Sequence, residues 1–235
     1  NIMAKIFLNV PIVDGAEAKN LGAEYHDYFQ RWYFDSEKYN PARFEKWSYY
    51  LANVYANNFD VAKINFKCPS CQKPTRVYSI FINSGYQLDF NLDITEEIKK
   101  SAVFYIEFLN WDIYDSLIIP HTHYGYRSTE CENAMVGRAI MNNCEYCMTT
   151  IPDSVLYALY GDSSVLLPED IGKITYVNFD QPIFLFGNTM PLSPKFDFMR
   201  EVSSEEFIKI FPSDDTPSPS SNKSIFQKIK EVFFY

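Results

Sequence analysis

The chain has 235 residues, of which 47% are hydrophobic and 17% aromatic, so it is long enough to bury a sizeable core and is expected to be globular. Its formal charge of −9 argues against a general affinity for nucleic acid, because Lys and Arg drive binding to phosphates. No run approaches the ~18 apolar residues of a membrane span and no charged-then-apolar leader precedes Met3, so we expect a cytoplasmic protein without a membrane partner.

The first 51 residues are predicted to form a small αβ module. Residues 5–10 alternate apolar and polar side chains and predict a strand that ends at Pro11. A helix follows, with Asp14 as its N-cap and Gly22 as its C-cap. A second strand is expected at 30–34. A second helix is expected over 39–47, with Pro41 in its first turn and with Phe44 and Trp47 on one face.

Residues 52–212 are predicted to form a larger α+β domain. Strands are expected on both sides of the turn Cys68–Cys71, and one or two helices over 93–117, capped by Thr95 and apolar through Leu109. We expect a loop over 118–137, followed by strand-like residues around a second cysteine turn within 140–157. Two short strands are expected in 174–187. A helix is expected over 201–211, with a capping box at Ser203 or Ser204.

The end of the chain changes in composition. Residues 213–222 belong to a stretch rich in Pro, Ser and Thr and predict a flexible linker. Residues 223–235 place Ile225, Ile229, Val232 and Phe233 on one stripe, which predicts an amphipathic helix. Such a helix either packs on the core of its own chain or inserts into a groove of a partner.

Four of the five cysteines form two Cys-x-x-Cys pairs, Cys68 with Cys71 and Cys144 with Cys147. Without a secretion signal, this pattern favours metal over disulfides. Zn²⁺ takes four thiolates in a tetrahedron, so the two turns predict one structural zinc ion. The 72 residues between Cys71 and Cys144 exceed the gap of a compact zinc ribbon, which predicts a split ribbon with an insertion at about 83–139.

Two other interpretations of these cysteine pairs remain. Reduced, buried cysteines also pack as small hydrophobic side chains without any metal. Alternatively, Cys68 and Cys71 form a redox dithiol, although the strand-then-helix context of thioredoxin-like motifs is missing around them.

The remaining ligand types lie together in sequence. His121 and His123 on an extended segment would share a face and could hold a second metal with Cys131 or Glu130. Isolated His-x-His pairs are more often ordinary surface or satisfied residues. A Cys131–His121 nucleophile pair lacks a recognisable sequence context. The chain also has no phosphate-binding glycine loop, no Gly-x-Ser-x-Gly and no His-Glu-x-x-His.

The N-terminal module combines cations with aromatic residues. Stacking on Tyr25, Trp32 and Trp47 together with the charges of Lys19, Arg31 and Lys46 would suit single-stranded nucleic acid. The competing interpretation is that these aromatic residues are the core of a small domain. The module has 6 basic and 7 acidic residues, which favours the core interpretation.

The sequences KIFLNVP, EAKNLGAEY, QRWYF and ARFEKW, read in order over about residues 4–50, resemble a module of unknown function found in bacterial plasmid primases and mobile-element proteins. That family commonly has Trp where this chain has Tyr25, and Lys where it has Arg31. In similar proteins the module precedes a zinc-binding region, which CPSCQKPTRVY at 68–78 and MNNCEYCMTTIPDSVL at 141–156 resemble, with Met148 where Gly is common. The resemblance implies a zinc site and names no activity.

These observations favour a non-catalytic, zinc-stabilised interaction protein that contacts single-stranded nucleic acid, or a replication or defence partner, through its N-terminal module. The first alternative is an acidic protein-binding immunity or DNA-mimic protein, because residues 52–212 carry 12 basic and 20 acidic side chains. The second alternative is a metal-dependent hydrolase that uses the loop from His121 to Cys131.

Overall fold

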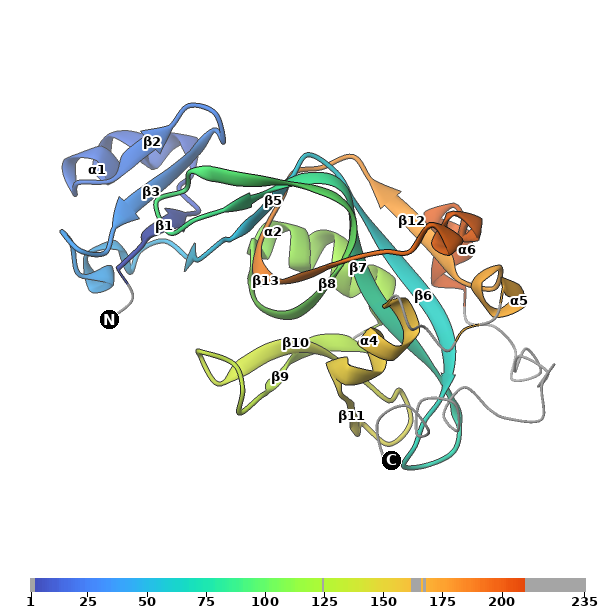
Figure 1. Ribbon diagram of the computed structural model, residues 1–235. Coiled ribbons are helices and arrows are strands. Elements are labelled where there is room, and N and C mark those ends of the chain that lie inside the picture. The colour runs from blue at the N-terminus through green and yellow to red at the C-terminus, as the bar shows by residue number, and fades with distance from the viewer. Residues whose placement is uncertain (1–2, 124, 162–165, 167, 210–235) are drawn as a thin grey trace.

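The structure is a computed structural model that describes residues 3–123, 125–161, 166 and 168–209. Within these residues the chain is a mixed α+β protein that is rich in strands and has few helices, in agreement with the predicted fold class. The strands form one sheet of four and one sheet of ten (Figure 1). The predicted linker 213–222 and helix 223–235 lie outside the described residues.

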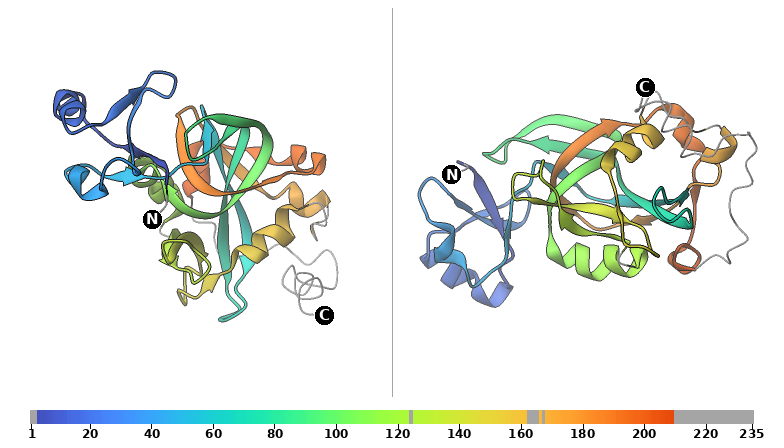
Figure 2. Two further views of the ribbon diagram at one scale, coloured as in Figure 1. Left: turned by 60° about the vertical axis from the view of Figure 1, so that its left-hand side comes forward. Right: turned by 90° about the horizontal axis from the view of Figure 1, so that it is seen from below.

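The small sheet comes from the N-terminal segment and stands at one end of the molecule (Figures 1 and 2). Its strand order is β2-β3-β1-β4. The predicted strands at 5–10 and 30–34 are present, whereas β2 and β4 were not predicted. The elements are β1 (Lys5–Leu8), the 3-10 turn Ile12–Asp14, α1 (Gly15–Asn20), β2 (Glu24–His26), β3 (Arg31–Asp35) and β4 (Tyr49–Tyr50).

The helix predicted for 39–47 is wrong. Only one 3-10 turn forms, Pro41–Phe44, and the Asn40 side chain caps it by accepting the N–H of Ala42 at 2.9 Å. The turn is short because the chain must reach β4, where Tyr49 pairs with Leu8. Its apolar side chain is still buried, since Phe44 stacks on Phe34 with ring centroids 4.5 Å apart.

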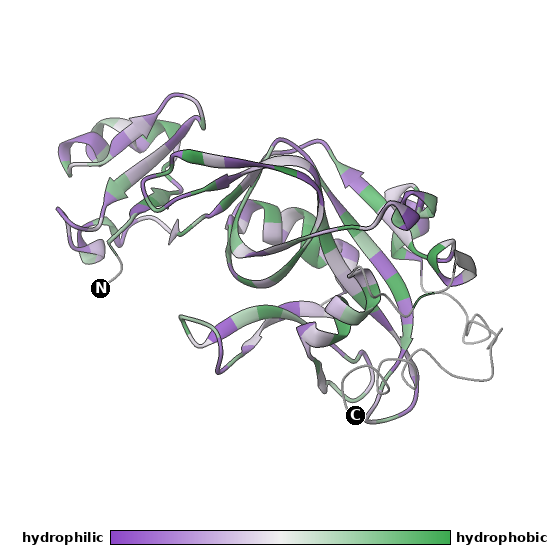
Figure 3. Ribbon diagram, viewed as in Figure 1, coloured by the Kyte–Doolittle hydropathy of each residue, from purple (hydrophilic) through white to green (hydrophobic). Residues whose placement is uncertain are grey.

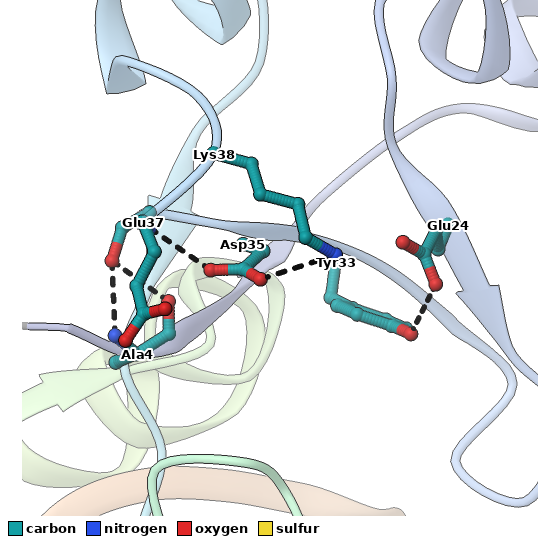
Figure 4. A network of polar contacts seen from close by, with 7 residues as sticks. Ala4, Glu24, Tyr33, Asp35, Glu37 and Lys38 are labelled. Atoms are coloured by element: carbon teal, nitrogen blue, oxygen red, sulfur yellow. Dashed lines mark hydrogen bonds and ion pairs between the residues drawn. The ribbon is translucent and has the colours of Figure 1, made fainter.

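Polar contacts hold the edges of the small sheet together (Figure 4). The Tyr33 hydroxyl donates to Glu24 Oε2 at 2.8 Å and links β3 to β2. Near the chain start, the N–H of Ala4 donates to Ser36 Oγ at 3.0 Å, and the Ser36 hydroxyl donates back to the Ala4 carbonyl at 2.8 Å. These contacts fix the beginning of β1 against the turn that follows β3.

The large sheet has the order β11-β10-β8-β13-β5-β7-β6-β12-β14, and β9 pairs with β10. Because β7 also pairs with β8, the strands β5, β7, β8 and β13 close a ring. Figure 1 shows β7 and β8 curving across the whole body of the protein. The strands are β5 (Val54–Ala56), β6 (Phe59–Lys67), β7 (Pro74–Leu88), β8 (Ile94–Leu109), β9 (Tyr126–Glu130), β10 (Arg138–Asn143), β11 (Thr150–Ile151), β12 (Thr175–Phe179), β13 (Ile183–Pro191) and β14 (Arg200–Glu201).

The helices predicted over 93–117 are wrong for most of that range, because residues 94–109 form the long strand β8. A helix begins only at Trp111 and continues to Thr122 as α2 (Trp111–Ile113), a π-helical turn (Tyr114–Ile118) and α3 (Ile119–Thr122). The loop predicted for 118–137 is therefore also wrong, since it contains α3 and β9. β8 lies between β7 and β13, so the stretch 83–139 continues the sheet that carries the first cysteine turn.

Two further helices pack beside the large sheet. The predicted helix at 201–211 is present as α6 (Ser204–Ile208), capped by Ser203 Oγ, which accepts the N–H of Glu206 at 3.2 Å. The helix α4 (Asp153–Tyr160) follows the second cysteine turn and was not predicted. The remaining helical segments are α5 (Pro168–Ile171) and the 3-10 turn Pro194–Phe198.

Both faces of the central strands of the large sheet are buried. One hydrophobic cluster contains Ile80, Val103 and Ile106, and a second contains Phe81 and Phe104 from the same strands. The strand β6 still alternates hydrophobic and hydrophilic residues along its length (Figure 3). Within the described part of the chain, every helix is too short or too polar to cross a membrane.

Candidate metal centre

The first cysteine turn joins the ends of β6 and β7. Cys68 begins it directly after β6, and its N–H donates to the Lys73 carbonyl at 2.9 Å. The N–H of Gln72 donates back to the Cys68 carbonyl at 3.0 Å. Gln72 has a left-handed backbone, with φ of 61°. These two bonds curl the turn so that Cys71 returns toward Cys68.

The second cysteine turn, between β10 and β11, repeats this geometry. The N–H of Cys144 donates to the Thr149 carbonyl at 2.9 Å, and the N–H of Met148 donates to the Cys144 carbonyl at 3.0 Å. Met148 occupies the left-handed position, with φ of 60°. Glycine adopts this conformation without steric cost, whereas a side chain such as that of Met148 makes it less favourable.

The two turns face each other and bring four sulfur atoms together. Cys68 Sγ lies 3.7 Å from Cys147 Sγ, and Cys71 Sγ lies 3.6 Å from Cys144 Sγ. All four sulfur atoms lie within 4.8 Å of one another, close enough to bind one metal ion, and none forms a disulfide. The four cysteines that the sequence pairs by spacing are therefore one cluster.

The cluster has different solvent exposure on its two sides. Cys68 and Cys144 are buried, Cys71 is half-buried and Cys147 is exposed. Burial raises the pKa of the Cys68 thiol to about 12, so a nearby cation is needed to hold it as a thiolate. Hydrogen bonds with the side chain and backbone of Thr149 lower the pKa of Cys147 to about 6. A bound cation would favour the thiolate form of all four cysteines and would offset the cost of burying the Cys68 thiolate.

A buried asparagine joins the strands that carry the two turns. The N–H of Tyr78 on β7 donates to Asn142 Oδ1 at 2.7 Å, and Asn142 Nδ2 donates to the Tyr78 carbonyl at 2.9 Å. The pairing of β8 with β7 ends at Ile80, so none of the described strands pairs with Tyr78 on that side of β7. The Asn142 side chain takes the place of the missing strand.

A second connection lies closer to the cysteines. The N–H of Glu145, inside the second turn, donates to Thr75 Oγ1 at 3.1 Å, and Thr75 is the second residue of β7. Arg76 Nε donates to Glu145 Oε1 at 2.5 Å, and both side chains are largely shielded from solvent. These contacts align the two turns independently of any metal.

Asn142, Thr75, Arg76 and Glu145 were not predicted as site residues. Thr75 and Arg76 follow the first cysteine pair, and Asn142 and Glu145 lie beside or within the second, so their closeness to the cysteines in sequence was the signal that could have found them. Their pairing could not be read from the sequence, because the partners are 64 to 70 residues apart.

The histidines of the second predicted site point elsewhere. His121 is buried, its Nδ1 lies 2.6 Å from the Leu117 carbonyl, and burial lowers its pKa. His123 Nε2 lies 3.2 Å from the Ile208 carbonyl of α6. Cys131 lies in the turn between β9 and β10. Among the described residues, only the four clustered cysteines are close enough to share a metal, so these three do not form a site with Glu130.

The predicted nucleic-acid contacts do not form a single surface. Trp47 is only 5% exposed, and its Nε1 donates to Asp14 at 2.9 Å, so its ring belongs to the core. Lys46 forms ion pairs with Asp14 and Glu17. Asp14 occupies the predicted N-cap position of α1, but its side chain contacts Trp47 and Lys46 and makes no capping hydrogen bond to the helix.

The other four aromatic or cationic candidates lie on α1, β2 and β3. Tyr25 is exposed and contacts Trp32 edge to face, with ring centroids 5.3 Å apart. Arg31 lies 3.9 Å from Asp112, which precedes Ile113 in α2. Lys19 is exposed on α1. The pair Tyr25 and Trp32 is thus the accessible aromatic part of the predicted set.

Comparison with protein-family models, with curated proteins and with solved structures finds no significant match for this chain.

Proposed function

We propose that this chain is a non-catalytic interaction protein whose large sheet is closed by one zinc ion bound to Cys68, Cys71, Cys144 and Cys147. The observation that carries the proposal is the four-sulfur cluster. A tetrahedron with Zn–S bonds of about 2.3 Å has edges of about 3.8 Å. The two shortest sulfur pairs, at 3.7 and 3.6 Å, are close to that value.

The all-thiolate ligand set also supports zinc and a structural role. Soft thiolates favour zinc over hard cations such as Mg²⁺ or Ca²⁺. Catalytic zinc sites usually keep one coordination position for water, whereas four protein ligands leave none. The ion would therefore connect β6–β7 to β10–β11 rather than act on a substrate.

Metal analysis of the purified full chain tests the zinc site. We expect one equivalent of zinc in the native protein and less than half an equivalent in Cys68→Ser with Cys144→Ser. Cys131→Ser is the matched control, because Cys131 lies outside the cluster, and it should retain the full equivalent. Equal zinc content in all three proteins would refute the proposed ligand set.

A role for the ion in stability needs a separate measurement. Since a structural metal contributes its binding free energy to folding, a chelator should lower the thermal midpoint of native protein and of Cys131→Ser. The double cysteine variant should unfold at that lower temperature with or without chelator. An unchanged midpoint after complete metal removal would show that the ion does not close the fold.

For the partner, a protein is favoured over nucleic acid. Trp47 is buried, and Lys46 and Arg31 already face carboxylates, so the N-terminal module offers few free cations for phosphates. The resemblance to primase-associated modules makes a replication or defence protein of a bacterial mobile element the proposed partner class. The acidic excess of residues 52–212 also suits the immunity or DNA-mimic alternative, in which the partner is basic.

Fluorescence anisotropy with a labelled single-stranded oligonucleotide at low salt separates these partners. The proposal predicts no saturable binding by the full chain, and the same result for Tyr25→Ala with Trp32→Ala. Saturable binding by native protein that the double variant loses would restore nucleic acid as the partner. The hydrolase alternative would require a second equivalent of metal in the analysis above.

A further inference from the structure

A pocket opens where the N-terminal module meets the large sheet, away from the cysteine cluster. It has a volume of about 60 Å³. The residues used below come from four elements, namely Tyr50 from β4, Glu107 from β8, Trp111 and Tyr114 from the helix after β8, and Ser128 from β9. Such a volume is far below that of a site for a drug-sized ligand, so it accommodates one small group.

Aromatic rings form adjacent walls of this pocket. Trp111 and Tyr114 have ring centroids 5.6 Å apart and an angle of 78° between their planes. At this separation the edge of one ring packs on the face of the other, so a cation can contact only a ring face that this contact leaves open. Half of the Trp111 surface is exposed, although a tryptophan side chain of a globular protein is usually mostly covered.

A polar group without a partner also lines the pocket. Tyr50 is 3% exposed, and its buried hydroxyl has no hydrogen-bond partner among the described residues. Buried hydroxyls are normally bonded, so this one is an exception among the residues that line the pocket, and it is itself closed to solvent. The Ser128 hydroxyl oxygen accepts a hydrogen bond from Arg138 Nε at 3.2 Å and keeps its own proton.

The only ionised side chain among the residues that line the pocket is the carboxylate of Glu107. Its Oε2 accepts the N–H of Val136 at 3.1 Å, which fixes the group in place. The cations Arg31 and Arg127 lie near Tyr50 and Tyr114 but outside the lining, and Arg31 faces Asp112. The lining itself therefore carries a negative charge.

We propose that this pocket binds a primary alkylammonium group, with the cation against the ring of Trp111 and its N–H donors directed to Glu107. A small positive head with three donors matches the pocket in size, charge and polar partners. The same chemistry occurs in a lysine side chain of a protein partner and in a free polyamine. The proposal is independent of the zinc ion and of the role proposed for it.

The test follows the three indole N–H signals of the zinc-loaded full chain by NMR, with Trp111 assigned from its loss in Trp111→Phe. Butylammonium chloride is the probe, and 1-butanol at equal ionic strength is its neutral counterpart. We expect a saturable shift of the Trp111 signal alone with butylammonium, and at least tenfold weaker binding of 1-butanol.

Two variants distinguish recognition of the positive charge from nonspecific hydrophobic binding. Glu107→Gln retains an acceptor for the Val136 N–H but removes the charge, and should weaken butylammonium binding at least fivefold. Glu130→Gln, a carboxylate of β9 that does not line the pocket, should leave binding unchanged. Equal binding of 1-butanol, no effect of Glu107→Gln, or shifts that grow linearly on all three indoles would overturn the proposal.

A final comparison identifies the source of the ammonium group. Binding of N-acetyl-lysine methylamide more tightly than butylammonium would indicate a lysine of a protein partner. Tighter binding of spermidine would indicate a free polyamine. Failure of both compounds to bind would contradict the proposal as firmly as failure of butylammonium.

Discussion

Replacing Asn142 by Ala is expected to be among the most destabilising single changes near the cysteine cluster. The side chain is fully buried and makes both hydrogen bonds that the backbone of Tyr78 forms toward β10. Removing it leaves one N–H and one carbonyl of a buried strand without partners. Each orphaned group costs about 1–3 kcal/mol, so we expect a loss of about 2–6 kcal/mol in the free energy of unfolding.

This loss is large compared with the roughly 5–15 kcal/mol by which domains are usually stable. Urea unfolding of zinc-loaded protein, followed by tryptophan fluorescence, measures it as a lower midpoint at an unchanged slope. Asn91→Ala is the matched control, because Asn91 is exposed and its side chain makes no hydrogen bond that the structure records. A change below about 1 kcal/mol in Asn142→Ala would refute the view that Asn142 substitutes for a strand.

The same variant should also weaken metal binding, because Asn142 holds β10, which leads into the second cysteine turn, against β7. Residues that orient metal ligands without touching the ion typically change affinity about 10- to 100-fold. Competition with a chromophoric zinc chelator measures this under conditions where the variant is still folded. If Asn142→Ala lost stability but kept normal zinc affinity, Asn142 would contribute to the stability of the fold and not to metal binding.

Three further changes have clear expectations. Burial raises the pKa of Asp153 from 3.8 to about 6, so its contribution to stability is greatest below pH 3.8 and is lost as the pH rises through 6. At pH 7.5 the free energy of unfolding of Asp153→Asn should therefore exceed that of native protein by up to about 3 kcal/mol. Urea titrations at lower pH should show this difference disappearing toward pH 4. Gly85→Ala would place a Cβ 2.6 Å from the Tyr55 carbonyl oxygen, and should lower the thermal midpoint by several degrees, whereas a midpoint within 1 °C of native would contradict the close packing of β5 on β7. Met148→Gly should relieve the left-handed strain and raise stability by about 0.5–1 kcal/mol, and destabilisation would show that the Met148 side chain matters more than its backbone.

The cysteine turns and their flanking strands were accessible from the sequence because their signals are local. Two residues separate the cysteines of each pair, and alternating side chains mark β6 before the first turn. The strand β8 was missed for a physical reason. Its buried residues Ile98, Ala102, Ile106 and Leu109 recur at helical spacing, since both faces of the strand are covered.

A backbone irregularity strengthens this misleading pattern. Tyr105 has a φ of 48°, and the pairing of β8 with β13 shifts register at Gly187. Side chains before and after such a bulge fall out of simple alternation. The N–H of Tyr105 is bonded to Asp153 Oδ2 at 2.5 Å, a contact that spans 48 residues. No sequence window of ordinary length contains both partners.

The structure was also needed to decide which aromatic residues of the N-terminal module are buried in its core and which are exposed for contact with a partner. Composition predicts that most of them pack inside a small module, and Trp47 does so. Tyr25 carries the same kind of side chain yet is exposed, because it lies on the edge strand β2. Which side of a short strand faces the core depends on its register with β3, and residue type does not determine that register.

The 72 residues between the two cysteine turns give the proposed zinc ion a role in the folding reaction itself. A link across a loop of that length restricts the unfolded chain by about 4 kcal/mol in the chain-entropy treatment used for disulfides. Each cysteine pair sits in a turn whose own hydrogen bonds are local, so either turn can capture metal first while the intervening strands are still unpaired. The rate of zinc binding would then matter relative to the rate at which the intervening strands pair. Whichever step comes first would determine how fast the native sheet forms.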